Sequence, residues 1–282
     1  MAAKLIDGRK MAEEVLEGVK KKVAALRTPP CLAIILVGED PASMLYTRKK
    51  HEDCQKVGIV SRDMRLPAKT TQKQLVAEIQ KLNTDDSVDG ILVQLPLPAH
   101  LDEDMALLNI SPEKDVDGLH PLNFGNMAFS LGSILPCTPA GVIHMLKASK
   151  VQLQGKHAVV LGRSRMVGKP LALLLLNEDC TVTICHSRTR GLPSITRQAD
   201  ILCSAVGKAN TVTADMVKEG AVVIDIGTNK ADGKLVGDVD FEKVKENASL
   251  ITPVPGGVGP MTRAMLLENT LACYKERRAG RE

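Results

Sequence analysis

The stretch KHAVVLGRSRMVGKP at positions 156–170 indicates the fold of this chain. An apolar strand, a turn containing glycine and the start of a helix follow one another here. This order of elements places a pyrophosphate at a helix N-terminus in dinucleotide-binding proteins. The usual G-x-G-x-x-G spacing is absent, because Ser164 replaces the second glycine and Gly168 comes one residue late. The order of elements therefore predicts a dinucleotide-binding turn more strongly than the glycine spacing does.

Three further strand candidates lie downstream, and each leads into a segment that contains glycine. They are Asp200–Ala205 before Gly207, Ala221–Ile226 before Gly227 and Thr228, and Ser249–Ile251 before the segment 252–262. An ordinary tight turn explains any one of these glycines. Several of them at corresponding strand ends indicate a cofactor cleft, because glycine lets the backbone approach a ligand closely.

The residues after the strand expected over Thr181–Cys185 favour NADP as the cofactor. In NAD-binding proteins an acidic residue at this strand end binds the ribose 2′-hydroxyl, whereas a 2′-phosphate requires cations and hydrogen-bond donors. The chain has His186-Ser187-Arg188 there, Arg163 and Arg165 in the first turn, and no acid. The alternative is that these arginines simply face solvent.

The segment TPVPGGVGPMT at 252–262 is predicted to be a shaped loop, followed by a helix over 263–275. Its prolines lack an amide proton and its glycines allow positive φ, so neither a helix nor a sheet ladder is expected to run through it. A preformed loop suits a ligand-binding surface. A flexible linker is the alternative, but it would contain more serine and charge, and Val254, Val258 and Met261 would have no role there.

The first half of the chain alternates strands and helices, which predicts an α/β fold with a parallel sheet and helices on its faces. Between Ser111 and Pro139 there is no clear periodicity, and this part is predicted to be a loop-rich crossing between two domains. The expected elements before and after it are a helix over 8–26 capped by Asp7, strands over 31–37, 60–66 and 90–95, a helix over 41–57, a helix from the capping box Thr71–Gln74 to about Asn83, and a helix from Thr138 to about Ser149.

Polar residues near the strand ends of this first sheet are candidates for ligand binding. Tyr46 and Lys50 are four residues apart and share a helix face, and Gln94 ends a strand. Lys50 belongs to the charged run RKKHED at 48–53, which alone is more typical of a solvated helix face. Asp115 and Asp117 could bind a metal or a guanidine-like ring edge, but acids beside a glycine are more typical of a solvated turn.

Composition excludes several classes of function. The 282 residues are 44% apolar but only 2% aromatic, and the net charge of +4 is spread along the chain, which disfavours nucleic-acid binding. The seven cysteines lack the spacing of a metal site, so we expect reduced thiols and no metal. Because no secretory segment or membrane-length apolar run is visible, a soluble cytoplasmic protein is expected.

Together these motifs resemble one family, the bifunctional methylenetetrahydrofolate dehydrogenase/cyclohydrolases. They occur in family order, cover nearly the whole chain and are specific in combination. The resemblance implies two three-layer α/β domains with a cleft between them: a folate-binding domain over 1–138 plus 263–282, and a Rossmann-like NADP-binding domain over 139–262. The matching segments are Asp40-Pro41-Ala42-Ser43 with Tyr46 and Lys50, GILVQLPLP at 90–98, Pro112–Gly118, PCTP at 136–139, Gly162-Arg163-Ser164 with Val167-Gly168, and 252–262.

The resemblance also implies residue roles. Lys50 would be the principal cyclohydrolase residue, Gln94 would hold and tune it, Tyr46 would contact the folate, and Asp117 would bind the pterin edge. Thr228 departs from the family, whose members often carry an apolar residue there. The remaining substrate residues would be Leu95, Pro255, Gly256, Gly257 and Val258. The cofactor residues would be Thr138, Gly162, Arg163, Ser164, Ser187, Arg188, Gly207, Gly227 and Thr228.

The activity implied by the resemblance is oxidation of 5,10-methylenetetrahydrofolate with NADP, then hydrolysis to 10-formyltetrahydrofolate, in a homodimer joined through the NADP domains. Two alternatives stay open. One is another two-domain Rossmann dehydrogenase acting on a small hydroxy- or keto-acid, which leaves Tyr46, Gln94 and Asp117 without a joint purpose. The other is a non-catalytic NADP-binding sensor, which has no use for a tuned lysine.

Overall fold

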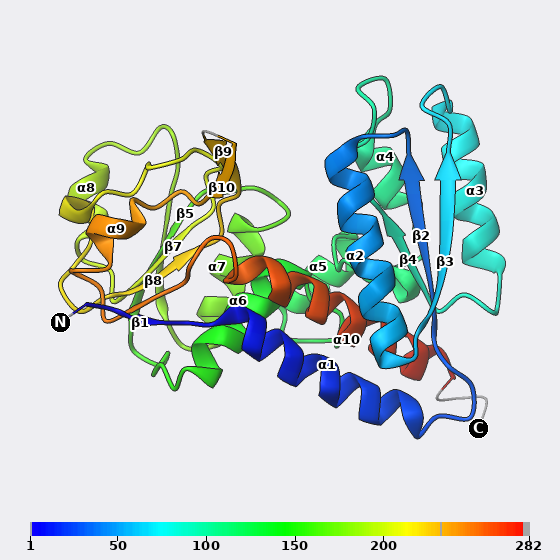
Figure 1. The fold of residues 1–282 in the computed structure, drawn as a ribbon, viewed down its shortest axis with the longest axis horizontal. Coiled ribbons are helices and arrows are strands. Elements are labelled where there is room, and N and C mark those ends of the chain that lie inside the picture. The colour runs from blue at the N-terminus through cyan, green and yellow to red at the C-terminus, as the bar shows by residue number, and fades with distance from the viewer. Residues whose placement is uncertain (1, 232, 279–282) are drawn as a thin grey trace. The chain divides into compact units, whose positions relative to one another are not determined.

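The computed structural model describes residues 2–231 and 233–278. These residues form two compact units. One contains the residues up to Ala12 together with Thr138–Thr262, and the other contains Glu13–Cys137 together with the residues from Arg263 onward. We call them the six-stranded unit and the three-stranded unit after their parallel sheets (Figure 1).

The sheet of the six-stranded unit has the strand order β1-β11-β8-β7-β5-β6, with every neighbouring pair parallel. Every residue of β7 and β8 is buried, as expected for parallel strands covered on both faces. β5 lies between β6 and β7, so the strand order reverses there, at the point where such sheets bind ligands. The strands are β1 (Lys4–Leu5), β5 (His157–Leu161), β6 (Thr181–Cys185), β7 (Ile201–Ser204), β8 (Val222–Asp225) and β11 (Leu250–Ile251).

The other elements of this unit are short helices and a hairpin. The hairpin pairs β9 (Asn229–Ala231) with β10 (Lys234–Val236) in antiparallel fashion. β1 pairs with β11, which explains why the first residues of the chain belong to this unit, whereas the sequence assigned 1–138 to the other domain. The helices are α6 (Cys137–Ala148), α7 (Gly168–Asn177), α8 (Leu192–Thr196), the 3-10 turn η2 (Ala214–Met216) and α9 (Phe241–Val244).

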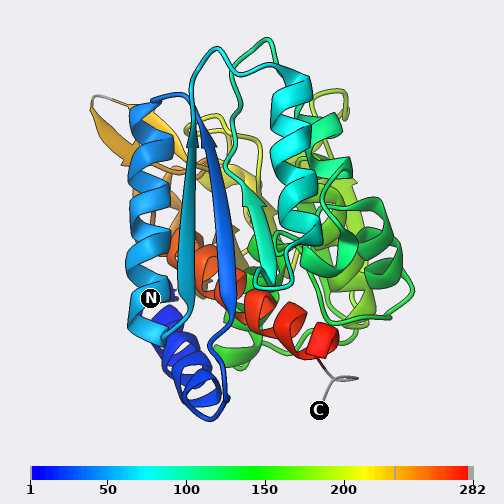
Figure 2. The same cartoon turned by 90° about the vertical axis from the view of Figure 1, so that its right-hand side faces the viewer.

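The three-stranded unit has the parallel order β3-β2-β4. The central strand β2 (Cys31–Val37) is buried along its whole length, whereas the edge strand β3 (Val60–Leu66) is partly exposed. The third strand is β4 (Gly90–Val93). Figures 1 and 2 show the helices α2 (Pro41–Val57) and α3 (Gln72–Thr84) on opposite sides of this sheet.

Local signals set most helix starts in this unit. Asp40 accepts a hydrogen bond from Ser43 N at the start of α2, and Thr71 and Gln74 form the expected capping box of α3. The predicted strands and helices of this unit are confirmed, although β4 ends at Val93 and not at Leu95, and the first helix of the chain ends at Ala24 and not at Leu26. The remaining elements are α1 (Gly8–Ala24), α4 (Glu103–Leu108), the 3-10 turn η1 (Pro112–Lys114), α5 (Pro121–Ala128) and α10 (Val258–Arg278).

Two loop predictions are wrong in part. The helix α10 begins at Val258, inside the segment predicted to be a loop, because a helix tolerates Pro260 in its first turn, where amide protons have no intrahelical partner. The crossing predicted over 111–139 contains α5, whose first residue is Pro121 and whose start is capped by His120 Nδ1 accepting from Leu122 N.

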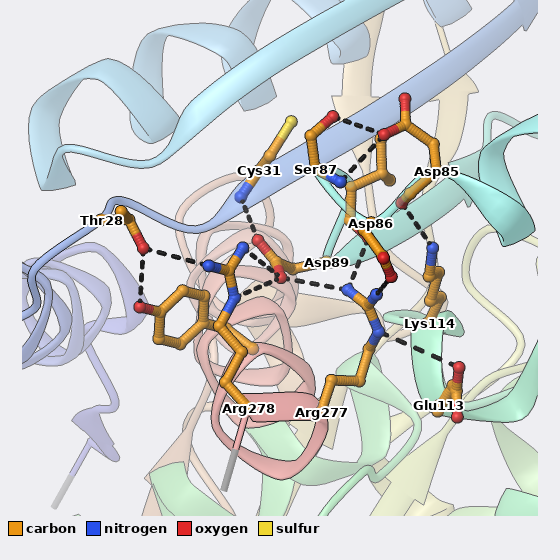
Figure 3. Close-up of polar contacts among 12 residues, drawn as sticks. Thr28, Cys31, Asp85, Asp86, Ser87, Asp89, Glu113, Lys114, Arg277 and Arg278 are labelled. Atoms are coloured by element: carbon orange, nitrogen blue, oxygen red, sulfur yellow. Dashed lines mark hydrogen bonds and ion pairs between the residues drawn. The ribbon is translucent and has the colours of Figure 1, made fainter. Parts of the chain in front are cut away.

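A buried carboxylate binds the end of α10 to the sheet of the three-stranded unit (Figure 3). Asp89 has no exposed surface, and it accepts hydrogen bonds from Cys31 N, Arg277 and Arg278. The guanidinium of Arg278 also lies 4.5 Å from the ring centroid of Tyr274. A buried charge with three donors is balanced, so loss of either arginine would leave Asp89 partly uncompensated.

A buried lysine caps the C-terminal end of α3 with hydrogen bonds. Lys114 is 1% exposed, and its Nζ donates to the carbonyl oxygens of Leu82 and Asp85, each at 2.8 Å. The last carbonyls of a helix have no intrahelical partner, so this ammonium group satisfies groups that would otherwise be orphaned (Figure 3). Burial lowers the pKa of Lys114, and the nearby Arg277 lowers it further.

Two further sequence expectations concern the cysteines and membrane insertion. All seven cysteines are free and buried, as expected for structural thiols. Within residues 2–231 and 233–278, no helix is long and apolar enough to cross a membrane.

Candidate active site

Lys50 and Gln94 meet in the three-stranded unit. The Nζ of Lys50, on α2, donates to Oε1 of Gln94 at 2.9 Å. Gln94 directly follows β4, and its Nε2 donates to the carbonyl oxygen of Leu95 at 2.6 Å. This second bond orients the amide so that its oxygen faces the lysine. The interpretation of the 48–53 run as a solvated face is therefore wrong for Lys50, which is only partly exposed.

Asp117 and Cys137 complete the electrostatic environment of Lys50. Burial is the main cause that lowers the pKa of Lys50, while the charge of Asp117 opposes this shift. Burial likewise raises the pKa of Asp117, and Lys50 and a hydrogen bond with Cys137 counteract it. Burial raises the pKa of Cys137 well above its ordinary value, and Asp117 adds to the effect. The cluster thus holds a lysine that loses its proton more easily than a solvated one.

Asn269 supports this cluster and was not identified from the sequence. It is buried on α10, and its Nδ2 donates to Val116 O at 2.8 Å and to Leu135 O at 2.7 Å. Val116 directly precedes Asp117, and Leu135 lies two residues before Cys137. The available signal in the sequence was a polar residue on the otherwise apolar face of the helix. A buried amide side chain is stable only where it finds hydrogen-bond partners, such as backbone carbonyls.

Asp115 and Asp117 have different environments. Asp115 is 2% exposed and accepts hydrogen bonds from His120 N at 2.8 Å and Asn123 Nδ2 at 3.1 Å, so it shapes the backbone. Burial raises the pKa of Asp115 to about 6. The solvated-turn interpretation is therefore wrong for Asp115. Asp117 is the carboxylate whose charge acts on Lys50.

The other substrate candidates are divided between the units. Tyr46 lies four residues before Lys50 on α2 and is 40% exposed, and Leu95 packs against the apolar core of the three-stranded unit. Pro255, Gly256, Gly257 and Val258 follow the six-stranded sheet, where Pro255 is exposed and Val258 is buried.

The turn between β5 and α7 fits a dinucleotide pyrophosphate. Gly162 has φ +110°, and a Cβ on it would lie 2.4 Å from Ala205 O. A Cβ on Gly168 would lie 2.2 Å from Gly162 O, so both positions require glycine. Ser164, in place of the second glycine of the common motif, accepts hydrogen bonds from Val167 N and Gly168 N. The first amides of this ten-residue helix donate within the chain, but the positive end of the helix dipole favours an anion at this turn.

The remaining cofactor candidates lie near the carboxyl ends of neighbouring strands or at the start of α6. Ser187 and Arg188 follow β6 and are exposed, as is Arg163 after β5. Gly207 follows β7, and Gly227 and Thr228 follow β8. Because β5, β6, β7 and β8 are parallel neighbours, these segments share one edge of the sheet. Thr138, in α6, shares a hydrogen bond of 2.9 Å with Thr262.

No group of three or more metal-ligating side chains occurs in the described part of the chain.

The two units together define a class of protein: a dinucleotide-dependent enzyme whose second unit contains a lysine with a lowered pKa. Comparison with known proteins agrees. The catalytic-domain model of the tetrahydrofolate dehydrogenase/cyclohydrolase family matches residues 6–117, and its NAD(P)-binding-domain model matches residues 136–278.

Individual relatives match along nearly the whole chain. The bifunctional protein FolD of Halalkalibacterium halodurans is 53% identical over 279 residues, which cover 98% of this chain and 100% of that protein. The crystal structure of FolD from Campylobacter jejuni is 50% identical with a TM-score of 0.96 and covers 98% and 100% of the two chains. The Trypanosoma brucei enzyme, solved with NADP cofactor and inhibitor, is 41% identical with a TM-score of 0.94, over 98% and 99%.

The chain belongs to the tetrahydrofolate dehydrogenase/cyclohydrolase family. The predicted family and fold class are confirmed. A small-acid dehydrogenase or a cofactor sensor is correspondingly disfavoured.

Proposed function

We propose how this bifunctional folate enzyme divides its two reactions among its residues. The reactions are NADP-dependent oxidation of 5,10-methylenetetrahydrofolate to the methenyl form and hydrolysis of that product to 10-formyltetrahydrofolate. The observation that carries the assignment is the hydrogen bond from Lys50 to Gln94, at a position where burial lowers the pKa of the lysine. A cofactor sensor has no use for such a lysine, and a small-acid dehydrogenase leaves Tyr46, Gln94 and Asp117 without a joint purpose.

The oxidation requires positioning more than acid–base chemistry. When bound, NADP accepts a hydride from the methylene carbon, and the lone pair of the folate nitrogen drives the transfer without a protein base. The turn residues Gly162, Arg163 and Ser164 hold the pyrophosphate at the N-terminus of α7, where the helix dipole favours an anion. Ser187 and Arg188 bind the 2′-phosphate. Thr138, Gly207, Gly227 and Thr228 contact the rest of the dinucleotide.

The hydrolysis uses the Lys50 cluster. Water adds to the cationic methenyl carbon with loss of one proton to solvent. The bond between that carbon and folate N5 then breaks, and the hydroxyl proton of the adduct must move to N5. Lys50 exchanges this proton because burial makes its neutral form accessible, and Gln94 fixes the position of its Nζ. Asp117 binds the pterin edge, and Tyr46 packs against the folate. Leu95, Pro255, Gly256, Gly257 and Val258 contribute the remaining folate contacts.

The assignment of folate binding to the three-stranded unit and dinucleotide binding to the six-stranded unit is part of the same proposal. We also propose that the enzyme works as a homodimer in the cytoplasm. The seven buried free thiols support a reducing compartment. Family resemblance supports the dimer.

Replacement of Lys50 by methionine tests the proposal. We expect Lys50→Met to abolish hydrolysis of methenyltetrahydrofolate while NADP reduction with methylenetetrahydrofolate survives at least in part, because only the hydrolysis needs the amine. Both activities are followed spectrophotometrically on the same preparation. The matched control is Lys49→Met, since Lys49 is exposed on the same helix. Equal loss of both activities in Lys50→Met would show that Lys50 has only a positional role.

A further inference from the structure

We infer that Asp225 and Asp238, two buried carboxylates of the six-stranded unit, are positioning residues that hold the loops after β7 and β8 in the conformation that binds the dinucleotide. Neither residue was identified from the sequence, and neither belongs to the proposed set of cofactor contacts. The inference rests on the proposed function only in that those loops contact NADP.

Asp238 gathers the loop after β7 around its side chain. It has no exposed surface. Its Oδ2 accepts hydrogen bonds from Val206 N at 2.7 Å and from Gly207 N at 3.3 Å. Its Oδ1 accepts from Lys208 N at 3.0 Å. Three successive amides therefore point at one carboxylate, which fixes the backbone path of the loop that contains Gly207.

The same carboxylate reaches the strand before this loop and the segment after β8. Its Oδ2 accepts from the buried Ser204 Oγ at 3.0 Å, and its Oδ1 accepts from Asn229 Nδ2 at 3.0 Å. Two loops from neighbouring strands are thereby held by one side chain. If Asp238 were replaced, both would lose their common anchor.

Asp225 anchors Asp238 in turn. Its Oδ1 accepts from Gly227 N at 3.0 Å and from Asp238 N at 2.9 Å, and its Oδ2 accepts from Val239 N at 3.0 Å. The backbone N of Asp225 donates to Thr252 Oγ1 at 2.7 Å. Thr252 opens the segment that leads to Gly256, so a third loop joins the network.

Two glycines make room for the carboxylates. A Cβ on Gly227 would lie 2.0 Å from Asp238 Oδ1, and a Cβ on Gly237 would lie 1.8 Å from Asp225 Oδ2. Neither glycine has a positive φ, so the requirement is for space and not for backbone conformation. Glycine is therefore required at position 227 because any side chain there would collide with Asp238, which the sequence alone did not indicate.

The negative charges are stabilised by dipoles. Among the described residues, no lysine or arginine side chain pairs with either carboxylate, and the partners are amide and hydroxyl donors. Most of these donors are backbone amides, whose positions the chain path fixes, so the network sets the loop geometry without a mobile ion pair. Burial raises the pKa of Asp225 to about 6, and the neighbouring charge of Asp238 contributes.

Replacement of Asp238 by asparagine tests the inference, because it keeps the size of the side chain and turns one acceptor into a donor. We expect the Kd for NADP, measured by calorimetry, and the KM for NADP to rise about tenfold or more. Hydrolysis of methenyltetrahydrofolate should stay within about twofold of wild type, since it does not use the dinucleotide and the bond that holds Thr252 comes from Asp225, which this variant retains. The matched control is Asp240→Asn, which removes an exposed ion pair with Lys243 in the same segment and should change neither value.

Ser204→Ala is the second variant, in case Asp238→Asn does not fold by circular dichroism. It removes one donor to Asp238 from a strand residue outside the proposed contacts, and we expect a smaller rise in the Kd for NADP, about twofold to fivefold. An unchanged Kd in a folded Asp238→Asn, or in Ser204→Ala where Asp238→Asn is unfolded, would overturn the inference. So would an equal loss of hydrolysis and NADP binding. Failure of the wild-type protein to act on folate would instead refute the proposed function, since NADP binding is measured without folate.

Discussion

The two units form their candidate sites from different kinds of chemical group. In the three-stranded unit, side chains that can gain or lose a proton face one another: Lys50, Asp117 and Cys137 all have pKa values shifted mainly by burial. In the six-stranded unit the candidate contacts combine glycines with exposed polar side chains such as Ser187 and Arg188, and buried carboxylates hold two of the loops. The first arrangement suits proton transfer, and the second suits binding an anion in a fixed position.

The contrast implies different sensitivities to substitution. A site made of side chains should lose chemistry while the fold survives, as expected for Lys50→Met. A site on loops that buried carboxylates hold in place should lose stability and binding together when a new side chain fills the space beside those carboxylates.

Gly227→Ala should have the largest effect on stability. The new Cβ would lie 2.0 Å from Asp238 Oδ1 and within 2.2 Å of its Cγ, so the buried carboxylate or the backbone must move. We expect a loss of about 2–4 kcal/mol in the free energy of unfolding, measured with urea.

The matched control for that variant is Gly18→Ala in α1, where a Cβ would meet no atom within 4 Å. This control should be neutral or stabilise by about 0.5–1 kcal/mol, because alanine favours a helix. If Gly227→Ala were as stable as the control, glycine there would not be making room for Asp238.

The pH dependence of stability should reveal the buried carboxyl groups. The pKa of Asp115 is about 6 in the folded protein, above its ordinary value of 3.8, so the folded state binds this proton more tightly than the unfolded state. The stability that this group contributes is therefore present below pH 4 and is lost as the pH rises to 6. Asp115→Asn should flatten the stability profile between pH 4 and 6, by about 1–3 kcal/mol.

Chemical denaturation at several pH values measures this slope. Glu113→Gln is the control, since Glu113 is exposed in the same segment and should leave the slope as in wild type. An identical slope in Asp115→Asn and wild type would contradict the raised pKa.

Arg48→Ala should have the smallest effect. Arg48 forms an exposed pair with Glu52 at 2.9 Å on α2, two residues before Lys50. Such pairs contribute about 0.2–0.5 kcal/mol, so stability and both activities should stay close to wild type. Loss of the hydrolase activity in this variant would mean that the whole charged run, and not Lys50 alone, supports the chemistry.

Local patterns predicted most of the fold. Continuous apolar runs identified β2 and β5, and the capping residues Asp40 and Thr71 identified the starts of α2 and α3, because each signal acts within a few residues. The start of α10 was not predictable in this way, because prolines and glycines disfavour a helix in general but are tolerated in its first turn.

Local sequence patterns identified the residues of the candidate site less well than they identified the fold. Lys50 is one of three consecutive cations, and only its contact with Gln94, 44 residues away, distinguishes it. Asn269 acts on Val116, 153 residues away. Such contacts depend on tertiary packing, and no local spacing encodes them. The family resemblance named Lys50 and Gln94, but it did not lead to Asn269, Asp225 or Asp238.

Lys114, the lysine that closes α3, has a consequence for chemical labelling. Its amine is enclosed and bound to two carbonyl oxygens, so an acylating reagent cannot reach it while the end of that helix is formed. Exposed lysines such as Lys49 would react at once. The rate of Lys114 acylation, read by mass spectrometry, therefore reports how often the three-stranded unit opens by local unfolding.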